Sequence, residues 1–123
     1  MDYSSLIMAA QSAKSLRPAF KDDLVTVVHV NRTDRSSTVV AFIEPGGGLR
    51  PHLHREHDEI IVFLSGKAIF RLGDELRSAA VNDVISVPAG TVHATIRAET
   101  ACILVAVFAP GFDLANEDRV YVD

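Results

Sequence analysis

The sequence predicts an all-β domain with one helix at its N-terminus. From residue 24 onward, short runs rich in Val, Ile, Thr and Phe alternate with polar or Gly- and Pro-containing turns every several residues. About nine such runs within 123 residues indicate a sandwich or a closed barrel, because βαβ units would need long helical segments between the strands.

The predicted elements can be placed in chain order. Residues 2–17 have apolar positions near helical spacing and predict an amphipathic helix, which Pro18 ends. We expect this helix to pack on the outside of the sheets, with a lid or a dimer contact as the alternative. The predicted strands are 24–30, 38–44, 52–54, 59–64, 67–72, 75–80, 84–87, 94–98 and 101–108, the last two forming a hairpin.

The chain length predicts a single domain with a core of its own. Residues 1–23 supply the helix and lead-in, 24–110 the barrel, and 111–123 a tail that docks on the outside of the barrel.

Composition excludes several classes of protein. The net charge is -4 with acidic and basic residues interspersed, so there is no basic face for nucleic acid. No apolar run approaches the roughly 20 residues of a membrane span, and Asp2 stands where a signal peptide would carry positive charge. Cys102 is the only cysteine, so no disulfide forms within the chain. These observations predict a cytoplasmic protein.

Two stretches gather the residues that bind metals. His52 and His54 are two positions apart, so on one strand their imidazoles face the same side. Glu59 follows at an odd offset, and the polar segment 55–58 must bend to bring it back inward. His93 follows the turn at residues 88–90. We predict that His52, His54, Glu59 and His93 hold one divalent transition metal ion inside the barrel.

Three imidazoles and one carboxylate leave one or two positions open on a six-coordinate ion, which a substrate, water or dioxygen would occupy. A closed structural zinc site is mostly thiolate-rich, and this chain cannot build one. The ligand set accepts Fe, Mn, Ni, Zn, Co or Cu, and the order of affinities does not choose among them.

The spacing of these residues resembles that of a known family. The first motif of the cupin superfamily matches Gly46, five residues, His52-x-His54, four residues, Glu59, six residues and Gly66, and the centre of its second motif matches Pro88-x-Gly90-x-x-His93. The resemblance covers about residues 38–108. It implies a jelly-roll barrel (double-stranded β-helix) with the four metal ligands inside, and commonly a homodimer, as in small single-domain bacterial cupins.

Two positions depart from the family pattern. Asn82 stands where the second motif usually begins with Gly, and Asn tolerates the left-handed turn conformation. Arg97 stands where the motif usually ends with Asn. An inward Arg97 would favour an anionic substrate, whereas an outward Arg97 would be solvated, and the sequence leaves both open.

Two further residues are candidates for the site. His57 lies in the bend between ligands, where it is a candidate proton donor or acceptor, with a surface histidine as the alternative. Phe63 shares a strand face with Glu59 and is a candidate wall of the substrate pocket.

Cupins include dioxygenases, isomerases, epimerases, decarboxylases, lyases and non-catalytic binders, so the fold alone does not give the function. We predict a metal-dependent enzyme acting on a small polar or anionic molecule, with a dioxygenase as one form and an isomerase or lyase as another. The alternative is a non-catalytic small-ligand-binding cupin that serves as a sensor or accessory protein.

Overall fold

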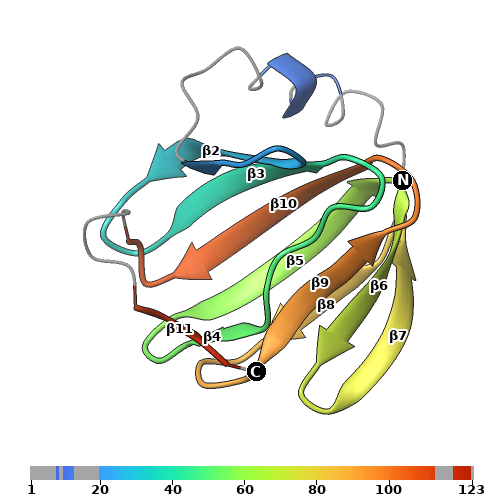
Figure 1. The fold of residues 1–123 in the computed structure, drawn as a ribbon. Helices are drawn as coiled ribbons and strands as arrows, with labels where there is room; N and C mark the ends of the chain where they lie inside the picture. The colour runs from blue at the N-terminus through green and yellow to red at the C-terminus, as the bar shows by residue number, and fades with distance from the viewer. Residues whose placement is uncertain (1–7, 9, 13–19, 113–117, 123) are drawn as a thin grey trace.

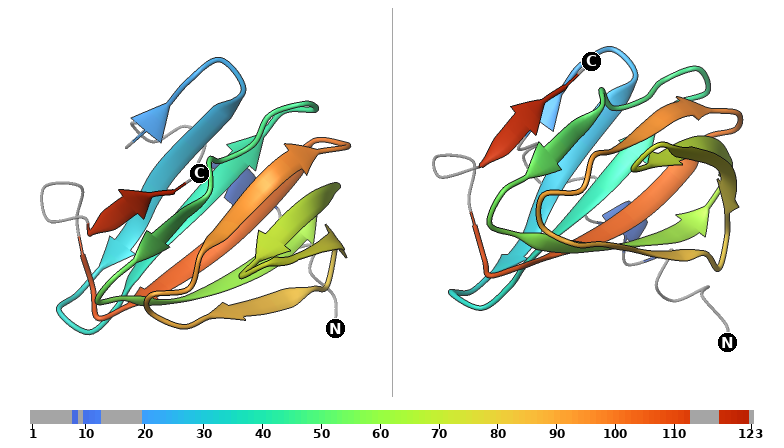
Figure 2. Two further views of the ribbon diagram at one scale, coloured as in Figure 1. Left: turned by 60° about the horizontal axis from the view of Figure 1, so that its bottom comes forward. Right: turned by 90° about the horizontal axis from the view of Figure 1, so that it is seen from below.

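The computed structural model describes residues 8, 10–12, 20–112 and 118–122. Within them, strands form two antiparallel sheets that face each other (Figure 1, Figure 2). The six-stranded sheet has the order β1 (Phe20–Lys21), β2 (Val25–Arg32), β3 (Ser37–Ile43), β10 (Cys102–Ala109), β5 (Asp58–Ser65) and β8 (Val84–Val87). The five-stranded sheet has the order β11 (Arg119–Tyr121), β4 (His52–His54), β9 (His93–Ala98), β6 (Lys67–Leu72) and β7 (Glu75–Ala80). The predicted all-β jelly-roll barrel is confirmed.

Strand β10 shows why long apolar runs form strands here. Cys102, Leu104, Ala106 and Phe108 are buried between the sheets, at every second position. The alternate positions of the strand are half-buried, and two of them pack on a second apolar cluster outside the six-stranded sheet. Because both faces of the strand are covered, its sequence is continuously apolar rather than alternating.

The chain changes sheet repeatedly along its length. Strand β4 lies in the five-stranded sheet, β5 in the six-stranded sheet, and β6 in the five-stranded sheet again. The predicted hairpin of 94–98 and 101–108 is wrong, because β9 pairs with β4 and β6 whereas β10 pairs with β3 and β5. The short connection at residues 99–101 crosses between the sheets instead of joining neighbours in one sheet.

The predicted turn at residues 82–83 also joins strands of different sheets, β7 and β8. Asn82 has a φ of 77°, and is the only non-glycine residue in the described part of the chain with positive φ. Asn tolerates this conformation better than most residues, so the absence of Gly at this position does not disturb the turn.

The main core lies between the sheets and contains the rings of Phe63 and Phe70 in an edge-to-face arrangement 6.4 Å apart. The second apolar cluster includes Ala10, from the short helical stretch at 8 and 10–12, packed with Val28 and Phe42. The rest of the predicted helix 2–17 lies outside the described residues. No helix in the described ranges is long and apolar enough to cross a membrane.

Part of the predicted tail extends a sheet. Strand β11 pairs with β4, opposing Arg119 to His54, Val120 to Leu53 and Tyr121 to His52. The Val122 N–H donates to the Pro51 carbonyl at 3.0 Å. Residues 113–117 and 123 of the tail lie outside the described part. In Figure 2, β11 lies side by side with β4 at the edge of the sheet.

Candidate metal centre

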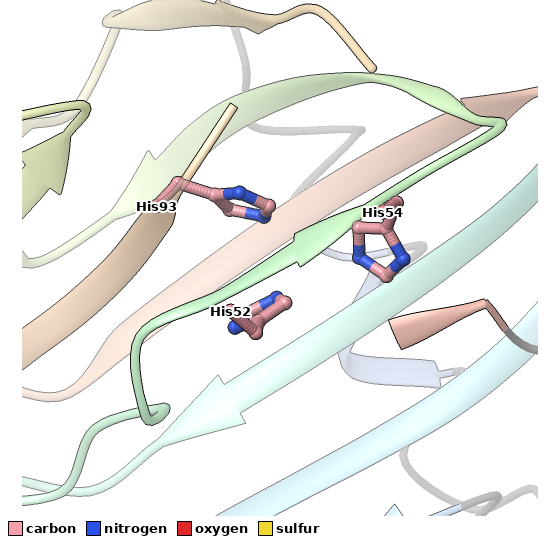
Figure 3. A group of neighbouring side chains, drawn as sticks. All are labelled: His52, His54 and His93. Carbon is pink, nitrogen blue, oxygen red and sulfur yellow. The ribbon is translucent and has the colours of Figure 1, made fainter. Parts of the chain in front are cut away.

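Three histidines meet inside the barrel. His52 and His54 lie on β4, and His93 begins β9 directly opposite His52. One ring nitrogen from each lies within 4.8 Å of the others, and all three residues are buried. Figure 3 shows the three rings close together around β4. The two motifs therefore come together through the pairing of β4 with β9.

Glu59 reaches the histidines from the opposite sheet. It lies near the start of β5, and its Oε1 is 2.8 Å from His93 Nε2 and 3.7 Å from His54 Nε2. Residues 55–57 carry the chain from β4 in one sheet to β5 in the other. On one unbroken strand, the odd spacing between His54 and Glu59 would place their side chains on opposite faces. The crossing removes this conflict, because side chains on two facing sheets can converge.

The outer nitrogen of each histidine has an acceptor beside it. Nδ1 lies 2.6 Å from the Arg50 carbonyl in His52, 3.2 Å from Asp118 Oδ1 in His54, and 3.0 Å from the Thr91 carbonyl in His93. These acceptors favour the tautomer with the proton on Nδ1, which leaves Nε2 with a lone pair. Histidines that bind metals through Nε2 are oriented in this way.

The atoms that face one another fit a cation. Among the described residues, His54 Nε2, His93 Nε2 and Glu59 Oε1 are buried and have no hydrogen-bond partner. With Nδ1 protonated, His93 Nε2 and Glu59 Oε1 are both acceptors at 2.8 Å, which is unfavourable unless a positive centre lies between them. A divalent metal ion satisfies all three atoms, and the nitrogen and oxygen donors suit the metals that the sequence allowed.

Burial favours the neutral form of two of the histidines, His52 and His54. It lowers the pKa of His52 from 6.5 to about 3, with a further contribution from the neighbouring His93. Burial also lowers the pKa of His54, although Glu59 acts in the opposite direction. Metal ligands must be unprotonated, so the lowered pKa values of His52 and His54 favour metal binding by these two residues at physiological pH.

The other predicted site residues have different positions. His57 is buried, with Nδ1 2.9 Å from Asp118 Oδ2 and its ring 4.9 Å from that of Phe112, so it is not a surface histidine. Arg97 is exposed on β9, and the structure does not bring it to the histidines. Phe63 faces the same side as Glu59, but its ring contacts Phe70 in the main core.

The aromatic rings next to His54 belong to Phe108 and Phe112 rather than to Phe63. Phe108 lies 5.1 Å from the His54 ring, and Phe112 lies 6.0 Å from it. Phe108 is directly opposite Glu59 in the pairing of β10 with β5. Both phenylalanines are buried, so they form an apolar wall beside the cluster.

Sequence reasoning placed the tail on the outside of the barrel but missed the contributions of Asp118 and Arg119 to the site. Because β11 is antiparallel to β4, Arg119 and Tyr121 stand beside His54 and His52 on the same face. The positive charge of Arg119 contributes to the lowered pKa of both histidines. Asp118 holds His54 and His57. The alternating run Arg119-Val120-Tyr121 was the available signal, but a strand of three residues is too short to be recognised from sequence.

Comparisons with known proteins identify the family. A cupin domain model matches residues 39–108, more than half of the chain. An uncharacterized protein of Aquifex aeolicus is 30% identical over 96 residues, which is 78% of each chain. This chain belongs to the cupin family.

Solved structures share the fold. KdgF from Halomonas is 22% identical, with a TM-score of 0.72 over 79% of this chain and 88% of that one. Pac13, a nucleoside dehydratase from Streptomyces, is 20% identical, with a TM-score of 0.70 over 89% of this chain and 88% of that one. At these identities the likeness shows the cupin fold and not a shared activity.

Proposed function

We propose that this cupin is a metal-dependent enzyme acting on a small polar or anionic molecule. The observation that carries the proposal is the set of buried, unsatisfied donor atoms on His54, His93 and Glu59, completed by His52. Unsatisfied polar groups in a core cost free energy, so a fold that keeps them together is organised around a ligand for them.

Each residue has a distinct part in this proposal. His52, His54, His93 and Glu59 would hold the ion, and their acceptors fix the ring orientations. When bound, a divalent metal supplies Lewis-acid or oxygen chemistry at the positions the protein leaves open. The apolar rings of Phe108 and Phe112 exclude water from one side of the cluster.

An anionic substrate is supported by the basic residues beside the cluster. The guanidinium of Arg119 donates to the Tyr121 hydroxyl at 3.2 Å, and that of Arg50 lies 4.4 Å from the centre of the Tyr121 ring. Tyr121 is half-exposed and its ring lies 6.2 Å from that of His52, so the residue that contacts both cations also neighbours the cluster. Guanidinium groups bind carboxylates and phosphates through paired hydrogen bonds.

The solved structures give an example of one of the two forms of enzyme chemistry. Pac13 is a nucleoside dehydratase and therefore an example of lyase chemistry on a cupin barrel. Dioxygenase activity in this chain is the form that requires iron and consumption of oxygen. The metal that copurifies with the protein thus determines which chemistry to screen first.

The experiment is a turnover assay with matched variants. Protein loaded with its copurifying metal is screened against small carboxylates and phosphates by oxygen uptake and by mass detection of products. We expect turnover that is lost in Glu59→Gln and kept in Glu75→Gln, because Glu75 is exposed at the start of β7. Tight binding without turnover in any metal form would contradict the enzyme and support the non-catalytic binding cupin.

We also propose that the protein is a homodimer. Ile60, Val62 and Val84 share the outer face of the six-stranded sheet next to its edge strand β8, and Ile60 and Val84 are exposed. Apolar groups beside a sheet edge favour association of two copies. Sedimentation analysis that gives a monomer at micromolar concentration would contradict the homodimer. The cytoplasmic location stays a prediction from the sequence.

A further inference from the structure

One carboxylate connects the C-terminus to the candidate metal centre. Asp118, immediately before β11, has both oxygens in use. Its Oδ1 is 3.2 Å from His54 Nδ1, its Oδ2 is 2.9 Å from His57 Nδ1, and Oδ2 also accepts the Glu56 backbone N–H at 2.5 Å. All three partners belong to residues 54–57.

Those partners form the segment that determines how the ligands meet. His54 is the last ligand on β4, Glu59 is the ligand on the six-stranded sheet, and residues 55–57 join them across the barrel. By holding Glu56 and His57, Asp118 fixes the path of this connection. By holding His54 Nδ1, it also fixes the ring that must present Nε2 to the ion.

Strand β11 supports β4 in a second way. Strand β4 pairs with its other neighbour, β9, at the single register position His52 and His93, whereas β11 pairs with all three residues of β4. The Val122 N–H adds a bond to the Pro51 carbonyl just before β4. Two of the three histidines therefore lie on a strand whose outer edge is covered by residues 119–121.

We propose that β11 is a strap over the metal centre and that Asp118 is the positioning residue that couples its docking to metal binding. The inference rests on the proposed metal site. A docked strap holds His54 in its ligand orientation, so by linkage a bound metal must stabilise the docked strap by the same factor. Asp118 touches neither ion nor substrate in this account, because it acts through His54 and the segment 55–57.

The test uses the full-length chain without a tag, and Zn(II) as the probe. Zinc affinity is measured by competition with a chromophoric chelator, and backbone amide exchange is followed for the residues of β11. The variants are Asp118→Asn, which keeps one acceptor oxygen but loses the charge and the second acceptor, and Asp118→Glu, which restores the carboxylate. Asp74→Asn is the control, because it makes the same change of charge at a residue that is fully exposed in the β6–β7 turn.

We expect Asp118→Asn to weaken zinc binding about 10–100-fold, Asp118→Glu to recover part of that loss, and Asp74→Asn to match the wild type. Zinc should slow exchange of the β11 amides in the wild type by a similar factor, and much less in Asp118→Asn. A circular dichroism spectrum like that of the wild type shows that each variant is folded.

Each part of the proposal would be contradicted by a different result. Equal zinc affinity in Asp118→Asn and the wild type would overturn the role of Asp118 while leaving the metal site intact. Weaker affinity with unchanged β11 exchange would overturn the coupling to the strap. Absence of zinc binding by the wild type would overturn the proposed metal site itself, and the coupling with it.

Discussion

The two ends of the barrel interior are built from different chemistry. At one end, Phe63 and Phe70 are fully buried and pack against apolar neighbours. At the other end, the same strands carry buried titratable groups, with Glu59 four residues before Phe63 on β5. Burial stabilises the fold at the first end and costs free energy at the second. The difference shows that one end of the core stabilises the fold, whereas the other end holds the candidate metal ligands.

The largest expected effect on stability comes from the apolar end. Phe63→Ala should lower the free energy of unfolding of the metal-free protein by about 3–5 kcal/mol, because it opens a cavity around Phe70. Urea denaturation measures this change. Zinc affinity of the folded variant should stay unchanged, and a clear loss of affinity would show that Phe63 lines the site after all, as the sequence analysis predicted.

Acid should destabilise the polar end. His52 has a lower pKa in the folded protein (about 3) than in the unfolded chain (6.5), so the unfolded state binds more protons between these values. The free energy of unfolding of the metal-free protein should therefore fall as pH drops from 6.5 toward 3. The slope expected from His52 is about 1.4 kcal/mol per pH unit, and His54 adds to it.

The matched variant for this titration is His52→Gln, which removes the ionisable ring. Urea denaturation at several pH values should give a shallower slope for the variant than for the wild type. Equal slopes would mean that His52 is protonated as easily in the folded protein as in the unfolded chain. That result would contradict the claim that burying this end of the barrel interior costs free energy.

A smaller effect is expected on anion binding, where Arg119 and Arg97 should differ. Arg119→Gln should weaken binding of a dicarboxylate probe, oxalate, to the zinc-loaded protein by about tenfold, because one charged hydrogen-bond donor next to the histidines is lost. Arg97→Gln is the control, since Arg97 is exposed on β9. Isothermal titration calorimetry measures both. An effect of Arg97→Gln as large as that of Arg119→Gln would contradict this assignment of the anion-binding residue.

The smallest effect is expected at the turn of the apolar end. Asn82 already has a φ of 77° and donates its N–H to the Phe63 carbonyl at 3.1 Å. Asn82→Gly relieves strain in the folded state but adds freedom to the unfolded chain, so the free energy of unfolding should change by less than about 1 kcal/mol. Thermal denaturation that shows a larger loss would mean that the Asn side chain itself stabilises the turn.

Local pattern predicted most of the fold. Strands 67–72, 75–80 and 84–87 have the predicted bounds, because each is a short run closed by turn residues. The sheet to which a strand belongs could not be predicted in the same way. Strands β9 and β10 are separated by a short connection that fits a hairpin equally well, and only the packing of the whole barrel places them in different sheets.

The candidate site divides in the same way. His52, His54, Glu59 and His93 could be found from spacing, because strand geometry fixes which residues share a face and the spacing itself is rare. Asp118 could not, because it meets His54 across 64 residues of sequence through a three-residue strand. Contacts of that kind depend on tertiary packing and leave no local pattern.

The central claim is that the three histidines and Glu59 hold a metal ion. The direct measurement is elemental analysis of tag-free protein, as purified and after reconstitution, beside His93→Ala. His29→Ala serves as the control, since His29 lies on β2 outside the histidine cluster. We expect about one equivalent of a divalent transition metal in the wild type and the control, and near none in His93→Ala. No metal in the reconstituted wild type, or full retention in His93→Ala, would contradict the account.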